Sequence, residues 1–270
     1  MTPHFITRRT LPLLGIAALA VAMPNFASAG VIVSDSFATG TVGANINGRT
    51  PDTTDLPGTT WVQNGYPGYQ NDIVSSPSSS LQLGAEAGDG IALTGVTATA
   101  YALSYEFNIA NDTPNTGTGI GSGLGFFRNA TTSGSPGALT GFTGVTVSMA
   151  GGVSLLENGT RVATATISSF VVSATHSLSY DVNTTTGSIS NLLLDGNAVT
   201  LTGTTTGIFT VSNIKEFGIT NNAGGYGNSF DYINNAVIAT PTSVPEPASL
   251  GILAVGAAGL LLAGRRKLRV

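Results

Sequence analysis

Residues 153–164 read Val-Ser-Leu-Leu-Glu-Asn-Gly-Thr-Arg-Val-Ala-Thr, and this stretch sets the class of fold. Asn158-Gly159 accommodates the positive φ angles of a type I′ turn, which joins two antiparallel strands. We therefore expect a hairpin with strands over 153–157 and 160–164. Residues 192–201 have the same form, with three leucines turning through Asp195-Gly196 into Asn-Ala-Val-Thr-Leu. The chain thus contains at least two predicted hairpins.

Outside the hairpins, apolar residues recur at every second position, which is the period of a half-buried strand. The segments are 31–33, 100–107, 145–149 and 177–182. Nothing between residues 30 and 240 has the pattern of a long amphipathic helix. Short strands separated by Gly, Asn, Ser and Thr turns predict an all-β fold, an antiparallel sandwich. A doubly wound α/β fold is excluded by the missing helices.

The N-terminus has the three parts of an export signal. Arg8 and Arg9 form a basic region, residues 11–23 are apolar, and Ala27 and Ala29 bracket a small-residue cleavage site. We expect a signal peptide over 1–29 that directs export by the general secretory route and is then removed. The paired arginines also fit twin-arginine export. The chain has no cysteine, so no disulfide stabilises the exported part.

The C-terminus has a short motif, an apolar stretch and a basic end. Residues 241–246 are a linker and the start of a motif that consists of Val244, Pro245, Glu246 and Pro247, and a transmembrane helix is predicted over 247–264. A cytoplasmic tail over 265–270 supplies the membrane stop, with cations at Arg265, Arg266, Lys267 and Arg269. The residues from Pro247 to Leu262, about 16, would rise roughly 24 Å as a helix, against a hydrocarbon core of about 30 Å. So short a span suits a temporary anchor.

This order of motif, span and basic end resembles the PEP-CTERM sorting signal of Gram-negative bacteria. The resemblance implies that an exosortase, a membrane-embedded processing enzyme, reads Pro245, Glu246 and Pro247 in a bacterium that makes extracellular polysaccharide. An ordinary C-terminal anchor, in which the prolines only end a linker, is the alternative. The exported part, residues 30–240, resembles concanavalin-like or laminin-G-like jelly-roll domains. The segments that carry this second resemblance are 34–37, 58–61, 123–128, 177–200 and 230–238. It implies that the last strand lies beside the first, with Phe37 sharing a core with Phe230 or Tyr232.

Charge and side-chain chemistry argue against several functions. Residues 30–240 contain four basic and 13 acidic residues, a formal charge of −9, which disfavours nucleic acid as a partner. His176 is the single histidine after the signal peptide, so a histidine-rich zinc site is impossible and we expect a structural role. A Gly-x-Ser-x-Gly elbow and the clustered acids of jelly-roll glucanases are missing. We expect solvated or turn roles for Glu106, Asp112, Glu157 and Asp195, and no enzymatic activity.

Cofactor and metal binding are not expected. Oxygen ligands for calcium occur at 52–55, 111–112, 181–183 and 195–197, but Asp and Asn at such places commonly stabilise turns. Aromatic residues are the better candidates for ligand contact. Tyr66, Tyr69 and Tyr226 lie in Gly-rich stretches and are the possible glycan contacts, whereas Trp61 is expected in the core.

These features favour an exported, noncatalytic cell-surface or extracellular-matrix protein, with exopolysaccharide as its expected associate. It would be held in the inner membrane at least transiently before reaching the cell surface or the medium. The expected partners are the exosortase, the inner membrane and exopolysaccharide. A carbohydrate-binding lectin or adhesin is the alternative, and an extracellular glycosidase or lyase is a third hypothesis.

Overall fold

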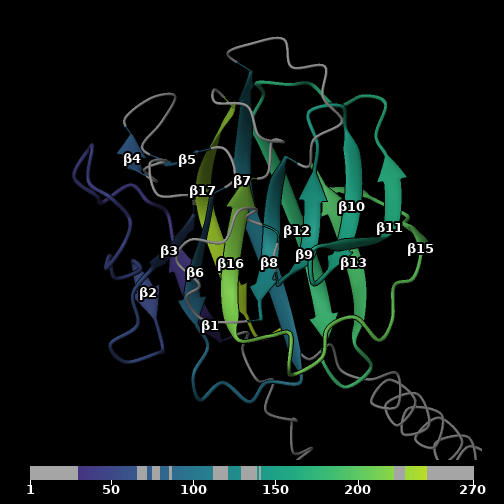
Figure 1. Ribbon diagram of the computed structural model, residues 1–270, viewed down its shortest axis with the longest axis horizontal. Helices are drawn as coiled ribbons and strands as arrows, with labels where there is room; N and C mark the ends of the chain where they lie inside the picture. The colour runs from purple at the N-terminus through teal and green to yellow at the C-terminus, as the bar shows by residue number, and fades with distance from the viewer. Residues whose placement is uncertain are drawn as a thin grey trace, which may run out of the picture. The chain divides into compact units, whose positions relative to one another are not determined.

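The computed structural model describes residues 30–65, 72–74, 80–84, 87–111, 121–128, 139, 141–221 and 229–241. These residues form two antiparallel sheets, and Figure 1 shows the strands of one sheet lying over those of the other. The all-β sandwich predicted from the sequence is confirmed. Among the residues described, there is no helix with the length and apolar character that crossing a bilayer requires. The predicted signal and anchor helices lie outside these residues.

Sheet A is built around the first and last strands of the sandwich. Its order is β14 (Asn197–Ala198), β13 (Ser188–Leu194), β12 (His176–Asn183), β7 (Ala100–Asn111), β17 (Ser229–Ala239), β1 (Val31–Asp35) and β2 (Thr53–Thr54). In addition, β5 (Ser80–Leu83) pairs with β17, and β4 (Asp72–Val74) pairs with β5.

Sheet B contains the first predicted hairpin. Its order is β15 (Thr202–Gly203), β11 (Thr160–Thr166), β10 (Gly152–Glu157), β9 (Phe142–Val147), β8 (Ser122–Phe127), β16 (Glu216–Asn221), β6 (Ala87–Ala92) and β3 (Val62–Gly65). Both predicted turns have the expected left-handed backbone, with φ of 50° at Asn158, 80° at Gly159, 52° at Asp195 and 72° at Gly196. The second hairpin's return strand, β14, is shorter than the predicted 197–201.

The core lies between the sheets and consists of every second residue of each strand. Sheet A contributes Leu103, Tyr105 and Phe107 from β7, and sheet B contributes Leu124 and Phe126 from β8, all at most 1% exposed. Trp61 is fully buried, as predicted. Its ring centroid lies 5.5 Å from that of Phe37.

The first and last strands pair as the jelly-roll resemblance implied, with Asp35 opposite Ala236. The prediction that Tyr232 shares the core with Phe37 is wrong. Side chains alternate along β17, and Asp231 and Ile233 are the fully buried ones, so Tyr232 points to the other face. The side chain of Phe230 lies outside the described part.

The outer face of sheet B, which points away from sheet A, has its own small apolar cluster of Phe127, Leu139, Phe142 and Leu156. Glycine makes this cluster possible. A methyl group on Gly144 would lie 2.9 Å from Cζ of Phe142 and 2.4 Å from the Leu124 carbonyl oxygen. The ring of Phe142 therefore sits directly on the sheet, and part of this outer face is buried.

Candidate functional site

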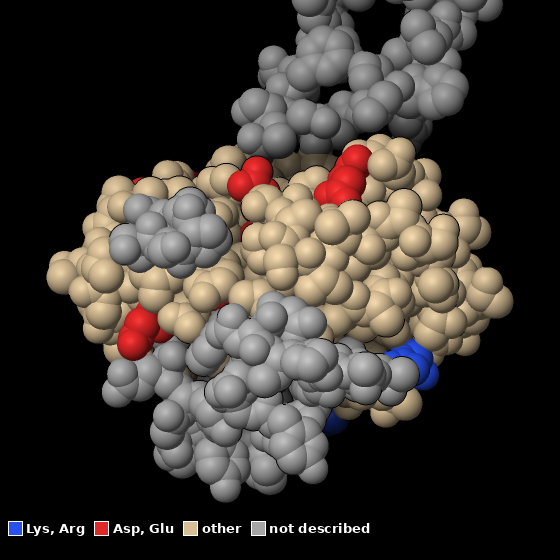
Figure 2. Space-filling model, turned by 90° about the horizontal axis from the view of Figure 1, so that it is seen from above, with Lys and Arg blue, Asp and Glu red and all other residues tan. Residues whose placement is uncertain are grey.

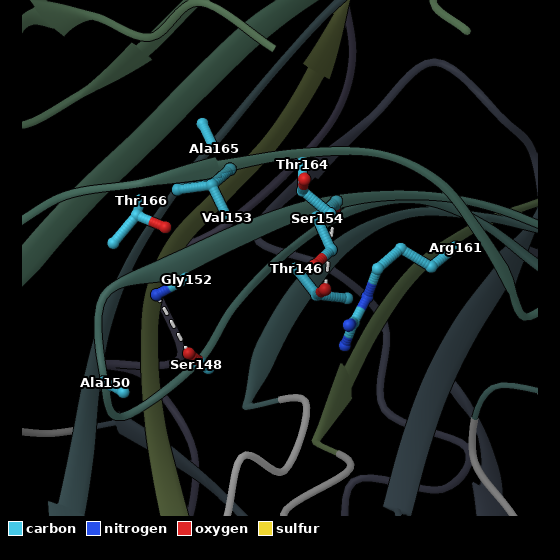
Figure 3. A pocket seen from close by; sticks show the side chains of 10 residues that line it. All are labelled: Thr146, Ser148, Ala150, Gly152, Val153, Ser154, Arg161, Thr164, Ala165 and Thr166. Atoms are coloured by element: carbon cyan, nitrogen blue, oxygen red, sulfur yellow. Dashed lines mark hydrogen bonds between the residues drawn. The ribbon is translucent and has the colours of Figure 1, made fainter. Parts of the chain in front are cut away.

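A groove of about 330 Å³ runs over the outer face of sheet B across β9, β10 and β11. Five of its ten lining residues carry hydroxyl groups and one carries a guanidinium (Figure 3). The lining residues are Thr146, Ser148, Ala150, Gly152, Val153, Ser154, Arg161, Thr164, Ala165 and Thr166. The groove is uncharged apart from Arg161.

The hydroxyl groups lie in a row because of strand register. Thr146 is paired with Ser154, Ser154 with Thr164, and Thr164 with Thr202, so one hydroxyl residue comes from each of four successive strands. Paired residues share a face, and neighbouring strands lie about 4.8 Å apart. The result is a regular line of hydroxyl groups perpendicular to the strands.

The row has a buried floor and an open rim. Thr146 is fully buried and its hydroxyl donates to the Ser154 carbonyl oxygen at 3.4 Å, while Ser154 is 7% exposed. Ser148 Oγ accepts from the Gly152 amide at 2.9 Å. Thr164 and Thr166 are exposed. The rim hydroxyls are thus the ones available to a ligand.

A β-bulge places Arg161 on the groove. Leu155 is paired with Ala163 but Leu156 with Arg161, so Val162 is the extra residue on β11. Without the bulge, Arg161 would lie on the same side as Ala163, which faces the core. With it, Arg161 is on the outer face and exposed, and Figure 3 shows its side chain extending over the pocket on the side of Thr146. The structure gives Arg161 no ion pair with any described residue.

The outer face of sheet A carries a second groove, of about 340 Å³, with the opposite charge. Asp181 and Asn191 line it, together with Ser104, Ser179 and apolar residues of β13 and β17. Asn191 Nδ2 donates to Asp181 Oδ2 at 2.6 Å. Charged groups are otherwise sparse on the described surface: in Figure 2 it is mostly uncharged, with a few separate acidic side chains and basic ones near one edge.

A cluster of carboxylates and one guanidinium joins β1 to the loop that follows it. Asp35 is fully buried and accepts from Arg49 Nη2 at 2.8 Å, Arg49 Nε at 3.2 Å and Trp61 Nε1 at 2.8 Å. Asp52 accepts from Arg49 Nη2 at 3.0 Å and from the hydroxyls of Ser36 and Thr39. Burial alone would raise the pKa of Asp52, but these hydrogen bonds and the Arg49 charge lower it to about 2. This cluster is structural, because its donors are internal to the fold.

A second buried carboxylate, Asp231, lies between the sheets. Burial raises its pKa to about 8, and the neighbouring Ser122 hydroxyl only partly opposes this effect. The hydroxyl of Tyr105 donates to Ser122 Oγ at 3.0 Å, and burial together with the nearby Asp231 charge raises the pKa of Tyr105 well above its ordinary value. Asp231 is therefore neutral over most of the physiological pH range.

His176 has the predicted structural role. It is 6% exposed, its Nδ1 lies 2.8 Å from Asp195 Oδ2, and its Nε2 lies 2.8 Å from the Val171 carbonyl oxygen. Its ring stacks on Phe170 with centroids 4.1 Å apart. Asp195 also accepts from the Ser177 amide at 2.9 Å. Both residues of the pair are thus used to fix the start of β12.

The other acids considered for catalysis are on separate sheets. Glu106 belongs to β7 of sheet A and accepts from Asn235 at 2.8 Å, whereas Glu157 ends β10 in sheet B. Asp112 lies outside the described residues. Within the part of the chain described, no three His, Asp or Glu side chains are placed to hold a metal ion. The calcium candidates Asp52, Asp181 and Asp195 all have the protein hydrogen bonds given above.

The predicted glycan contacts Tyr66, Tyr69 and Tyr226 lie outside the described residues, but the strand ends that flank them are described. Gly65, at the end of β3, is paired with Ala87, and Ala87 is paired with Asn221, at the end of β16. The stretches after Gly65 and after Asn221 therefore start at the same end of sheet B. The signal cleavage residues, the sorting motif and the basic tail also lie outside the described part.

Sequence reasoning missed Arg161 as a groove residue. Its hairpin was predicted correctly, but strict alternation from Ala163 puts position 161 inside, and nothing in residues 160–164 marks Val162 as the bulged residue. An indirect signal was present in the sequence. Strict alternation would bury the charge of Arg161 in the core, which is unfavourable, and a bulge that moves Arg161 to the outer face avoids this.

The described residues define the class of protein as all-β, an antiparallel sandwich of two sheets. Residues 243–267 match the family model described as the PEP-CTERM protein-sorting motif, which confirms the resemblance seen in the tail. The motif implies export and processing during transit across the membrane. No curated protein matches this chain.

Several solved structures have a similar fold. Peanut lectin is 14% identical with a TM-score of 0.45, over 69% of this chain and 99% of the lectin. A seed lectin of Lotus tetragonolobus is 9% identical with a TM-score of 0.47, over 71% and 96% of the two chains. Domain 4 of AbnA, a GH43 extracellular arabinanase of Geobacillus stearothermophilus solved with arabinotriose, is 11% identical with a TM-score of 0.44, over 80% and 95%.

Proposed function

We propose that this protein is a noncatalytic cell-surface or extracellular-matrix protein that associates with exopolysaccharide through the outer face of sheet B. The observation that carries the proposal is the row of hydroxyl groups in an open groove, on a chain whose tail carries a sorting motif. Serine and threonine hydroxyls both donate and accept hydrogen bonds, as sugar hydroxyls do. A flat row of them suits a polymer with repeating hydroxyl groups better than a compact ligand.

Sorting would proceed through the tail. The apolar segment 247–264 would hold the chain briefly in the inner membrane, with Arg265, Arg266, Lys267 and Arg269 on the cytoplasmic side. An exosortase-type enzyme would then recognise Pro245, Glu246 and Pro247. The sandwich would already be outside the inner membrane, because the signal peptide precedes it.

Intact-mass analysis of the exported protein tests the sorting step. We expect the wild-type protein to have lost its C-terminal segment and the Glu246→Ala variant to retain it. Glu157→Ala, which removes a hairpin carboxylate, is the matched control and should be processed normally. An unchanged C-terminus in the wild type and in Glu246→Ala alike would refute processing.

Binding of the purified full chain to exopolysaccharide from the producing cells tests the groove. Thr164→Val with Thr166→Val removes two exposed rim hydroxyls and keeps the β-branched shape. Each lost hydrogen bond is worth about 1 kcal/mol, so we expect affinity to fall at least about fivefold. Thr185→Val changes an exposed threonine in a distant turn and should leave affinity unaltered. Equal affinity of all three proteins would exclude the groove.

A lectin or adhesin that binds through Tyr66, Tyr69 and Tyr226 is the second candidate. The observation that favours it is the pairing of the flanking strand ends at one end of sheet B. The same binding assay separates the two sites. If Tyr66→Ala or Tyr226→Ala abolishes binding while the threonine variant binds normally, the contact surface is at that end and not on the outer face.

A further inference from the structure

We propose that the groove on sheet B selects an acidic polysaccharide, one whose sugars carry carboxylate groups, and that Arg161 is the residue that binds the carboxylate. This inference rests on the proposed function and names the chemical class of its ligand. It also assigns a role to a side chain that the fold places on the outer face through a bulge.

The distribution of charge singles out Arg161. Residues 30–240 contain only four basic residues, against 13 acidic ones. Arg49 is committed to Asp35 and Asp52. Arg128 and Lys215 are exposed but do not line the groove. Arg161 is therefore the groove's single cation, and none of the other nine lining residues is ionisable.

An acidic protein normally repels a polyanion, so binding requires a local site with the opposite charge. The groove meets this requirement, whereas the groove on sheet A presents Asp181. The nearest acid along the chain, Glu157, does not neutralise Arg161, since the structure shows no ion pair between these two described residues. No described residue takes up the guanidinium donors of Arg161 in an ion pair, so we infer that they serve a ligand.

The neighbouring groups fit an acidic sugar in particular. A guanidinium binds a carboxylate through two parallel, charge-assisted N–H···O bonds, which are roughly twice as strong as its hydrogen bonds to the uncharged hydroxyls of a neutral sugar. Thr164 and Thr166 lie on the same strand as Arg161 and offer hydroxyl groups to the hydroxyls of the same or the next sugar. A polymer of uronic acids presents both kinds of group at short, regular intervals.

The bulge at Val162 gives the proposal its structural support. It moves one side chain to the outer face while Val162 packs against the core. Bulges commonly re-aim a side chain at a functional position. Here the side chain that the bulge redirects is Arg161. It lies beside the row of hydroxyl groups, and without the bulge the groove would contain no charged residue.

The test compares the full chain's affinity for polygalacturonate, a uronic acid polymer, with its affinity for dextran, a neutral glucan. The variants are Arg161→Gln, which removes the charge, and Arg161→Lys, which keeps the charge but not the fork. Lys215→Gln is the control for net charge. We expect about a tenfold loss for polygalacturonate with Arg161→Gln, an intermediate loss with Arg161→Lys, and no change with Lys215→Gln. Added salt should weaken the wild-type binding of polygalacturonate.

Three results would overturn the inference. They are equal affinity for dextran and polygalacturonate, binding of neither polymer, or equal losses for Arg161→Gln and Lys215→Gln. Its failure is separable from that of the proposed function, because native exopolysaccharide is assayed in parallel, before and after chemical reduction of its carboxyl groups. Unaltered binding of the reduced polymer leaves the proposed function standing without the acidic ligand. No binding of native polymer refutes both. Because Arg161 is exposed, we expect its variants to be as stable as the wild type. Equal unfolding midpoints will show that the variants are folded.

Discussion

Asp35 and Asp231 are both fully buried aspartates, on strands that pair with one another, yet their surroundings differ completely. Asp35 receives two hydrogen bonds from the guanidinium of Arg49 and one from the indole of Trp61. Asp231 has Ser122 and Tyr105 nearby, both uncharged, and burial raises its pKa to about 8. The fold therefore gives one carboxylate charged and polar donors, and suppresses the charge of the other.

The difference shows how burial alone does not determine the state of a carboxylate. Removing an anion from water is costly, and the cost is offset only if donors and a countercharge replace the water. The first strand provides them through a loop that brings Arg49 and Trp61 back to Asp35. The last strand does not, so Asp231 takes up a proton instead. The region around Asp231 is therefore expected to be sensitive to pH near neutrality.

The largest effect is expected when the countercharge of Asp35 is removed. Arg49→Ala leaves a buried carboxylate without its cation, which typically costs about 3–5 kcal/mol of unfolding free energy. Urea denaturation at pH 7 measures this loss. Arg128→Ala, which removes an exposed arginine, is the matched control and should change stability by less than about 0.5 kcal/mol. A similar small loss for both variants would mean that Asp35 does not depend on Arg49.

The next effect is a dependence on pH that comes from Asp231. Its pKa rises from 3.8 in the unfolded chain to about 8 in the fold, so the folded state binds more protons between these values. Stability should therefore decrease as pH rises, by up to about 1.4 kcal/mol per pH unit, and level off above pH 8. Asp231→Asn keeps the shape and removes the titration.

Urea midpoints of wild type and Asp231→Asn from pH 5 to 8 measure this slope. We expect the two curves to diverge with rising pH, the variant becoming the more stable protein. Parallel curves would show that Asp231 is ionised in the folded state and that burial does not raise its pKa.

Local signals in the sequence predicted much of the fold. Asn158-Gly159 and Asp195-Gly196 specify their turns with neighbouring residues alone, and both hairpins form as expected. The strand period also located β7 and β12. These features need no knowledge of residues far away in the chain.

The sequence did not predict the features that depend on partners far away in the chain or on the exact register of a strand. Asp35 and Arg49 are 14 positions apart and meet because the chain between them folds back, and no local pattern encodes that pairing. Tyr232 was expected in the core, but a shift of one position along β17 places Asp231 there instead. Arg161 was hidden by the bulge on β11. A one-residue change in register reverses the face of a side chain, so site residues are harder to predict than strands.

The smallest effect should come from Asp52, and its pH dependence is opposite in sign to that of Asp231. Hydrogen bonds from Ser36 and Thr39, with the charge of Arg49, lower its pKa from 3.8 to about 2, overcoming the effect of burial. The folded state binds fewer protons, so this stabilisation is present above pH 4 and is lost as pH falls through 2. Asp52→Asn should cost about 1–2 kcal/mol at pH 7, because the carboxylate is partly exposed, and nothing near pH 2. Asp55→Asn is the control three residues away. A constant deficit for Asp52→Asn between pH 7 and pH 2 would show that its role is steric, leaving Arg49 and Asp35 as an isolated pair.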